Sequence, residues 1–328
     1  MIISRTPVRL SFAGGGTDFD KYYRLSERQG AVISTTINRY IYIFVNKRFD
    51  DLIQVSYSKT EIVESVDDVE HNIVREALKL LGIEKAIEIV YVADLPLTTA
   101  GSGLGSSSAL AVGVLNALYA YKGVHASSEQ LASEAYLIEQ NILGHPVGKQ
   151  DQYIAAYGGL NFIQFNNDGS VFVDPVICRP DTKRNLERCL MLFYTGLDRA
   201  SCSILSEQQD QIEEKVALHD KLVEIAVDLR AKLHNNELEE FGDILHSGWM
   251  AKRQLASGIS NSKIDNWYER ARSAGARGGK IAGAGGGGFL LLFCDEDRQQ
   301  AVRDSLPMLS HDPVKLEPQG SEIIYVSD

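Results

Sequence analysis

The chain has 328 residues, which is longer than one usual hydrophobic core and predicts two domains. Its composition, 44% hydrophobic and 23% charged, is typical of an ordinary soluble globular protein. A formal net charge of −11 argues against a nucleic acid or an anionic membrane as partner, so a phosphorylated ligand would have to be held by local groups.

The cysteines and the N-terminus point to a reducing compartment. The four cysteines have no C-x-x-C spacing, which argues against a disulfide framework and a zinc site. The N-terminus enters an alternating strand without a signal-peptide core, and no apolar run approaches the roughly 20 residues of a membrane helix. We therefore expect a cytoplasmic protein.

The first element is a strand over residues 2–13, in which the apolar residues alternate. Arg9 lies on the face opposite Val8 and Leu10. The strand leads into a turn in which three consecutive glycines precede Asp18. This flexible backbone allows Asp18 to point into a cleft, although an Asp at this place also caps turns. The sequence leaves both interpretations open.

The region that follows combines strands with a helix. Residues 31–48 contain the strand run 41–45, and residues 53–57 predict another strand. An amphipathic helix is expected over 69–81, followed by a strand over 87–92. Strands that come first, with helices packed against them, predict an α+β fold.

A loop rich in glycine and serine, residues 96–109, stands between the strand 87–92 and a largely apolar helix over 110–122. Backbone N–H groups and the dipole at a helix N-terminus favour an anion. The loop lacks the lysine of a G-x-x-x-x-G-K-[ST] sequence, and its glycines do not fit G-x-G-x-x-G. It is either a phosphate site of another kind or a flexible loop before a Ser-capped helix.

Two further acids stand on predicted helices. A capping-box pattern at Ser127 opens a helix that ends near Gly144, and Glu139 lies along the edge of its apolar stripe. Asp151 lies in the first turn of a short helix that ends at residues 158–159. Each acid is either a ligand or catalytic group in a cleft or an ordinary surface or dipole-compensating group. Spacing alone does not decide between these interpretations.

The second half begins after a Pro- and charge-rich connection over residues 175–187, where we place the domain boundary: residues 1–185 and 186–328. A strand over 190–194 precedes long helical segments over 203–258 and a helix over 263–274. A glycine-rich segment, 280–288, precedes the strand 289–293, and a helix over 297–309 and a strand over 322–326 end the chain.

The glycines at 283, 285 and 288 match G-x-G-x-x-G, the pattern of dinucleotide sites. A strand follows them instead of a helix, and no βαβ unit surrounds them, so we reject that interpretation. Neither H-R-D nor D-F-G occurs, which excludes a protein kinase. A glycine hinge that lets the backbone approach a ligand is the alternative.

Three glycine-rich segments in this order, residues 5–18, 96–109 and 280–288, resemble the three motifs of the GHMP kinases, the galactokinase, homoserine kinase, mevalonate kinase and phosphomevalonate kinase superfamily. The resemblance spans nearly the whole chain. It implies a two-domain α+β fold, with a ribosomal S5-like N-terminal domain that carries the phosphate loop and catalytic residues, a ferredoxin-like C-terminal domain, and ATP between them.

Within this superfamily, residues 12–18, 148–153, 194–196 and 258–261 resemble the kinases of D-glycero-D-manno-heptose 7-phosphate. The first motif also resembles fucokinases. Galactokinases carry Gly-Glu-His at the positions of Gly14, Gly15 and Gly16, so galactose is not the expected substrate.

The resemblance assigns roles to the acids. Asp151 would orient or deprotonate the anomeric hydroxyl, and Arg9 would keep Asp151 ionised and offset charge on the transferred phosphoryl group. Ser107 and Glu139 would hold Mg²⁺. Asp18, with Gly15, Gly16 and Thr17, would bind the sugar. The phosphates of ATP would lie against the loop residues Gly101, Ser102, Gly103, Leu104, Gly105, Ser106, Ser107 and Ser108, and the C-terminal glycine loop Gly285, Gly286 and Gly287 would close over the site.

The resemblance therefore implies an ATP- and Mg²⁺-dependent kinase that phosphorylates C1 of a heptose 7-phosphate, for nucleotide-activated heptose and surface polysaccharide. Its alternatives are a fucokinase-like enzyme for an unphosphorylated sugar and a catalytically silent protein that binds sugar and nucleotide. A cation is needed for the distal phosphate, and the sequence does not choose among Lys149, Arg199, Lys252 and Arg253. The sequence does not indicate the oligomeric state or the anomer.

Overall fold

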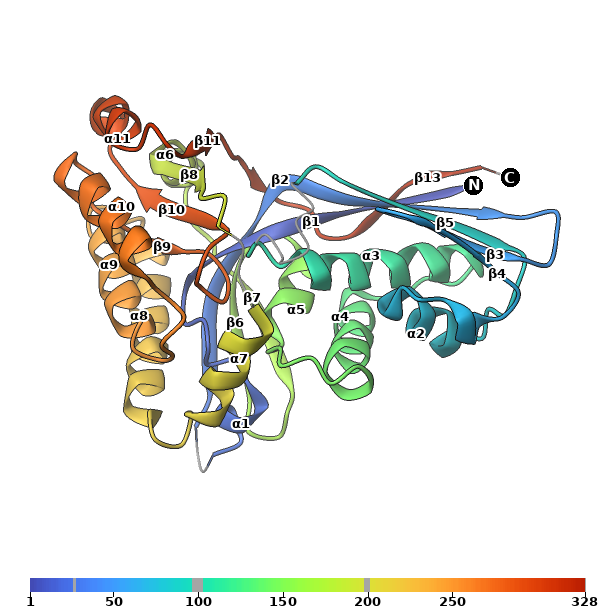
Figure 1. Ribbon diagram of the computed structural model, residues 1–328. Coiled ribbons are helices and arrows are strands. Elements are labelled where there is room, and N and C mark those ends of the chain that lie inside the picture. Colours follow the sequence, from blue (N-terminus) through green and yellow to red (C-terminus); the bar gives the residue numbers. More distant parts are fainter. Residues whose placement is uncertain (26–27, 96–102, 198–200, 328) are drawn as a thin grey trace.

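The computed structural model describes residues 1–25, 28–95, 103–197 and 201–327. Figure 1 shows a large twisted sheet with helices α2 to α5 on one face, and a small sheet beside a column of helices from the second half of the chain. The central loop of residues 96–102 lies outside the described residues, and with it Gly101 and Ser102 of the predicted phosphate site.

The larger sheet contains nine strands of the described chain, and its main path is β13-β1-β2-β5-β3-β4. Strands β6 and β12 pair with β2, and β7 pairs with β6. The elements up to residue 175 are β1 (Ile2–Ala13), α1 (Asp20–Tyr23), β2 (Gly30–Lys47), β3 (Ile53–Ser56), β4 (Thr60–Val63), α2 (Asn72–Leu80), β5 (Ile87–Ala93), α3 (Ser106–Tyr121), α4 (Ser128–Tyr136), α5 (Gln150–Tyr157), β6 (Leu160–Phe165) and β7 (Val171–Pro175), with a 3₁₀ turn at Val66–Asp68 and a π-helical turn at Leu137–Ile142.

Helix α3 is the centre of this half because it is apolar on all sides. Residues 108–115 of the helix are all buried, and the helix contacts β1, β2, α2, α4 and α5. The hydroxyl of Ser4 on β1 donates a hydrogen bond to the carbonyl of Gly113 at 2.8 Å, which fixes the helix to the sheet. A helix that is buried all round sits in the core rather than at the surface. Its N-terminus is therefore held rigidly, and it points toward the end of the sheet where the second half packs.

The smaller sheet has the order β11-β8-β10-β9, and its strands are antiparallel. Helices α8 and α9 pack between the sheets, since both contact β1 of the larger sheet and α9 also contacts β9. The elements are α6 (Pro180–Cys189), β8 (Leu190–Tyr194), α7 (Ser201–Asp210), α8 (Val216–His234), α9 (Phe241–Lys252), α10 (Ser262–Ser273), β9 (Gly278–Ile281), β10 (Phe289–Phe293), α11 (Gln299–Ser305), β11 (Ser310–Asp312), β12 (Leu316–Glu317) and β13 (Glu322–Val326), with a 3₁₀ turn at Glu296–Arg298.

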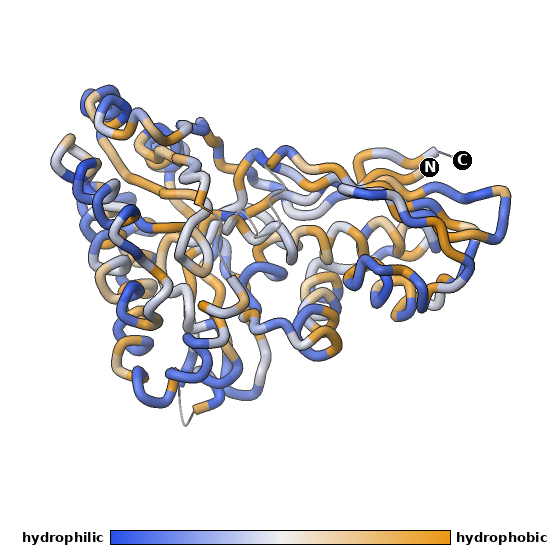
Figure 2. Tube along the Cα trace, in the orientation of Figure 1, coloured by the Kyte–Doolittle hydropathy of each residue, from blue (hydrophilic) through white to orange (hydrophobic). Residues whose placement is uncertain are grey.

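The first and last strands of the chain are neighbours in the larger sheet. Strand β13 pairs with β1, and the N-terminal ammonium group donates to the carbonyl of Ser327 at 3.0 Å. The hydropathy colouring of Figure 2 places apolar residues along the strands of both sheets and polar residues in the connection between β2 and β3. The α+β class predicted from the order of elements is confirmed. The boundary at residue 185 stays a prediction, and strands β12 and β13 of the second half belong to the larger sheet.

One stretch was wrongly expected to be a connection. Residues 175–187 include most of α6, which begins with Pro180 in its first turn and buries Leu186. Proline is favoured at a helix start because its missing N–H has no partner there anyway. With so few buried side chains, the helix shows little apolar periodicity. Among the described residues, none of the helices has the length and apolarity that crossing a membrane requires.

Candidate active site

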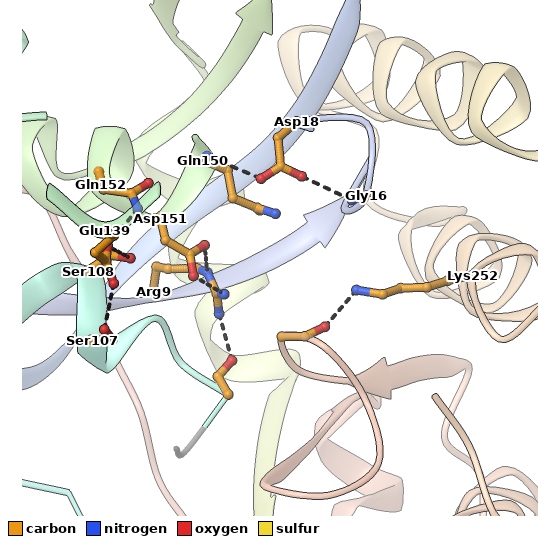
Figure 3. Close-up of polar contacts among 12 residues, drawn as sticks. Arg9, Gly16, Asp18, Ser107, Ser108, Glu139, Gln150, Asp151, Gln152 and Lys252 are labelled. Atoms are coloured by element: carbon orange, nitrogen blue, oxygen red, sulfur yellow. Dashed lines mark hydrogen bonds and ion pairs between the residues drawn. The ribbon is translucent and has the colours of Figure 1, made fainter. Parts of the chain in front are cut away.

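An ion pair between Arg9 of β1 and Asp151 of α5 forms the centre of the site (Figure 3). Arg9 Nε donates to Asp151 Oδ1 and Arg9 Nη2 donates to Oδ2, both at 2.7 Å. Two parallel, charge-assisted bonds fix the plane and the position of the carboxylate. The Arg9 side chain is 5% exposed and that of Asp151 is 22% exposed. Arg9 therefore fixes the position of the Asp151 carboxylate, while part of that side chain stays accessible to a ligand.

The end of the Gly-Ser loop lies directly against this pair. Arg9 Nη1 donates to the carbonyl of Gly103 at 2.7 Å, and the Arg9 backbone N–H donates to Leu104 at 2.9 Å. Gly105 caps helix α3 with a φ of +74°, and a Cβ atom added there would lie 3.1 Å from Asp151 Oδ2. Only glycine combines this backbone conformation with such an approach. The N-terminus of α3 thus lies beside the Asp151 carboxylate.

Behind this N-terminus lies a buried carboxylate, Glu139, in the π-helical turn that continues α4. Its Oε1 accepts from the Ser107 hydroxyl at 2.5 Å, and its Oε2 accepts from Ser108 at 2.7 Å and from Gln152 Nε2 at 2.6 Å. Burial raises the pKa of Glu139, and the three hydrogen bonds oppose that rise. A π-helical turn often marks a functional site, since it displaces side chains from ordinary helical positions.

The side-chain oxygens of Ser107 and Glu139 are of the type that binds Mg²⁺. A hydroxyl and a carboxylate oxygen are hard ligands, and Mg²⁺ usually takes one or two protein oxygens and completes its shell with phosphates and water. Ser107 is exposed at the start of α3, so the pair reaches the place where phosphates would lie. The described residues contain no cluster of three or more acidic, histidine or cysteine ligands, so they would hold this ion only together with its phosphates.

Asp18 lies on the other side of Asp151 and is 3% exposed. Its Oδ1 accepts from the backbone N–H of Gly16 at 3.1 Å, and its Oδ2 accepts from that of Gln150 at 3.2 Å. Burial and then the charge of Asp151 raise the pKa of Asp18, while the backbone bonds oppose the rise. The carboxylate therefore both stabilises the glycine turn and faces the pocket.

A pocket joins these groups to the second half of the chain. Arg9, Asp18 and Asp151 line it on one side, together with Ser11, Gly16 and Gln150. On the opposite side lie Leu205, Gln208, Lys252, Gly283 and Ala284. Lys252, at the end of α9, donates to the carbonyl of Gly283 at 2.7 Å (Figure 3). The pocket thus lies between the two halves, and residues far apart in sequence meet across it.

The predicted site residues do not all reach this pocket. Thr17 is buried, and its hydroxyl donates to the carbonyl of Gly14 at 2.8 Å, which gives it a role within the turn. Gly286 donates to Ile259, and a Cβ atom at Gly287 would collide with Leu197, so these glycines allow close backbone packing. The pocket is lined instead by Gly283 and Ala284, which precede them.

Sequence reasoning also missed polar residues that complete the site. Gln152 donates to Glu139, and Ser11, Gln150 and Gln208 line the pocket. Ser11 stands two positions after Arg9 on the same strand, so the alternation of β1 was a signal that both side chains share a face. Glutamines in helices carry no such signal, because most of them are solvated.

Comparisons with known proteins agree with this architecture. Residues 69–159 match the model of the GHMP kinases N terminal domain, and residues 229–307 match that of the GHMP kinases C terminal domain. A D-glycero-alpha-D-manno-heptose 7-phosphate kinase of Campylobacter jejuni is 30% identical over 312 residues, which cover 91% of each chain. An L-fucokinase/L-fucose-1-P guanylyltransferase of Bacteroides fragilis is 27% identical over 92% of this chain and 35% of its own.

Among solved structures, a D-glycero-D-manno-heptose 1-phosphate kinase from Bacteroides thetaiotaomicron superposes with a TM-score of 0.82 and 25% identity, over the full length of both chains. A Lactococcus lactis galactokinase complexed with galactose gives a TM-score of 0.78 at 18% identity over 98% of this chain and 94% of its own, which is a likeness of fold alone.

Proposed function

The chain belongs to the GHMP kinases, and we propose that it transfers the γ-phosphoryl group of ATP to the anomeric hydroxyl of D-glycero-D-manno-heptose 7-phosphate. The product would be the 1,7-bisphosphate, an intermediate toward nucleotide-activated heptose for surface polysaccharide, made in the cytoplasm. The two relatives named as heptose phosphate kinases support a heptose phosphate as substrate. The single observation that carries the reaction type is the Arg9–Asp151 pair between the start of α3 and the pocket.

In this proposal Asp151 accepts the proton of the anomeric hydroxyl or orients that hydroxyl for attack. The carboxylate is suited to this role because Arg9 holds it rigidly while 22% of its side chain remains exposed. The Arg9 guanidinium donates to the Gly103 carbonyl and so lies next to the end of the loop that would hold the phosphates. It therefore offsets negative charge that develops during phosphoryl transfer, which is chiefly a matter of positioning and electrostatics.

Ser107 and Glu139 would hold the Mg²⁺ that accompanies ATP, and that ion would neutralise the phosphate oxygens. The Ser107 hydroxyl is the accessible member, and the buried Glu139 accepts from it at 2.5 Å. Ser108 and Gln152 keep the Glu139 carboxylate in place. The phosphates would meet the free N–H groups at the beginning of α3, as anions do at helix N-termini.

Asp18 would accept hydrogen bonds from sugar hydroxyls. It is buried at the wall of the pocket, and the bonds from Gly16 and Gln150 keep its carboxylate directed there. A fucokinase-like activity on an unphosphorylated sugar is the second candidate, because the bifunctional fucokinase also aligns with 92% of this chain. A silent sugar- and nucleotide-binding protein is disfavoured, since Arg9 bonds to Asp151 and Ser107 bonds to Glu139, so both pairs of the machinery are present.

The experiment is a substrate panel with the purified protein and Mg-ATP. Heptose 7-phosphate, free heptose and fucose are compared by kcat/KM, with ADP release as the readout. The proposal predicts that heptose 7-phosphate is preferred by orders of magnitude. Equal turnover of free heptose would refute the proposed substrate, and preference for fucose would support the alternative.

A further inference from the structure

The end of the pocket formed by α9 carries a lysine that the reaction chemistry leaves without a role. Lys252 is 6% exposed, and its ammonium group reaches across the pocket toward the glycine turn after β1. A Cβ atom added at Gly15 would lie 3.2 Å from Lys252 Nζ, 3.7 Å from Ser11 Oγ and 3.8 Å from Gln150 Nε2. The absence of a side chain at Gly15 therefore makes room for the Lys252 ammonium group beside two polar side chains.

Two of the other candidate cations, Lys149 and Arg253, do not line the pocket. Lys149 Nζ donates to the carbonyl of Gly169 at 2.7 Å and lies over the rings of Tyr23 and Tyr136, and it does not line the pocket. Arg253 Nη2 pairs with Asp265 Oδ2 at 2.7 Å. Arg199 lies outside the described residues. Within the described part of the chain, Lys252 is thus the lysine that lines the pocket, and Arg9 is committed to Asp151.

The charge around this end of the pocket is unbalanced. A second lysine, Lys280 of β9, is 3% exposed. Burial, the charge of Lys252 and the charge of Arg9 hold the pKa of Lys280 well below its ordinary value, and Asp18 acts in the opposite direction. Buried cations near each other are unfavourable unless an anion compensates them. In a chain whose net charge is −11, an anionic group on the ligand would stabilise the charged forms of these two neighbouring lysines.

The same region offers unused hydrogen-bonding capacity. Ser11 is 4% exposed and lines the pocket, and its Oγ is buried without a partner, as is Gln150 Oε1. A buried hydroxyl usually has a partner, so its lack indicates a place for a ligand oxygen. The Ser11 hydroxyl can donate to a phosphate oxygen, as can the Gln150 amide nitrogen.

We propose that Lys252, with Ser11 beside it, binds the phosphate group that the acceptor sugar already carries, and so selects phosphorylated over free sugars. This inference rests on the proposed function, because it names the part of the pocket that recognises the phosphate of a sugar phosphate. Arg9 and Asp151 would engage the reacting end of the same molecule. The two ends of the acceptor would then be held by cations from the two halves of the chain.

The test compares Lys252→Met with wild type on heptose 7-phosphate and on free heptose at saturating Mg-ATP. Loss of a charge-assisted contact predicts that the preference for the phosphorylated sugar, as a ratio of kcat/KM values, falls about 10- to 100-fold. Most of the loss should appear in KM for heptose 7-phosphate, and Lys252→Arg should restore part of it. Arg253→Met is the matched control, because it removes the cation that follows Lys252 at the C-cap of α9, and it should leave the preference unchanged.

A second variant, Gly15→Glu, leaves Lys252 in place and sets a carboxylate beside its ammonium group. It should also abolish the preference, since the two charges would neutralise each other. Equal losses on both sugars in Lys252→Met would overturn the inference, as would an unchanged preference in both variants. A wild-type protein that shows no preference for the phosphorylated sugar would instead refute the proposed function, so the two failures are distinct.

Discussion

Replacement of Asp151 by asparagine tests the proposed base with little change of shape. In wild type, Asp151 accepts two bonds from Arg9, both at 2.7 Å. An asparagine retains one acceptor and turns an NH₂ group toward the second guanidinium nitrogen, so one charge-assisted bond is lost. Such a bond contributes about 1.5–3 kcal/mol. Part of this is screened by solvent, because the Asp151 side chain is 22% exposed.

We therefore expect Asp151→Asn to fold and to unfold at a moderately lower temperature. Loss of the base should lower kcat by about 10²- to 10⁴-fold, whereas the KM for ATP should change less than about threefold, because Asp151 faces the sugar. Steady-state kinetics and thermal unfolding measure both effects. Asp312→Asn is the matched control, since Asp312 pairs with Arg39 through two bonds outside the site, and its kcat should stay at the wild-type value. A kcat near wild type for Asp151→Asn would refute the assignment.

Two further substitutions test the buried acids. Glu139→Gln should fold, because the Gln152 amide can turn its unpartnered oxygen toward the new NH₂ group. In a Mg²⁺ titration of activity, the Mg²⁺ concentration for half-maximal activity should rise about tenfold or more. An unchanged Mg²⁺ requirement would contradict the metal assignment. Asp18→Asn should lower kcat/KM for the sugar about 10- to 100-fold, since the sugar hydroxyls lose a charged acceptor. The variant removes a buried charge but also loses one of the two backbone bonds that the carboxylate accepts. Because the folded state raises the pKa of Asp18, wild type loses stability as the pH rises from about 4 through the raised pKa, so the unfolding temperature of the variant minus that of wild type should increase in that direction. A difference that decreases instead would contradict the burial argument.

Helices and strands were easier to predict from the sequence than the burial and the contacts of individual side chains. Strand β1 alternates from Val8 to Phe12, and α3 is largely apolar after its opening serines, so both were recognisable from residue type alone. Helix α6 was missed because it buries little besides Leu186. The three acids and the arginine of the site were identified through resemblance to a family, since spacing alone left Asp18, Glu139 and Asp151 ambiguous.

What the sequence did not contain was the contact across the pocket. Lys252 was one of four cations among which the sequence did not choose, and only the packing of α9 against the glycine turn brings it beside Gly15 and Ser11. The burial of Glu139 was equally hidden, because the π-helical turn moves it off the position that ordinary helical spacing implies. Such features arise from long-range packing, which local periodicity does not encode.

The most direct measurement is phosphorus NMR of the purified protein with Mg-ATP and D-glycero-D-manno-heptose 7-phosphate. We expect ADP and a new phosphomonoester signal coupled to the anomeric proton, while the signal of the 7-phosphate persists. No turnover, or a new ester at any other carbon, would contradict the claim that Asp151 activates the anomeric hydroxyl.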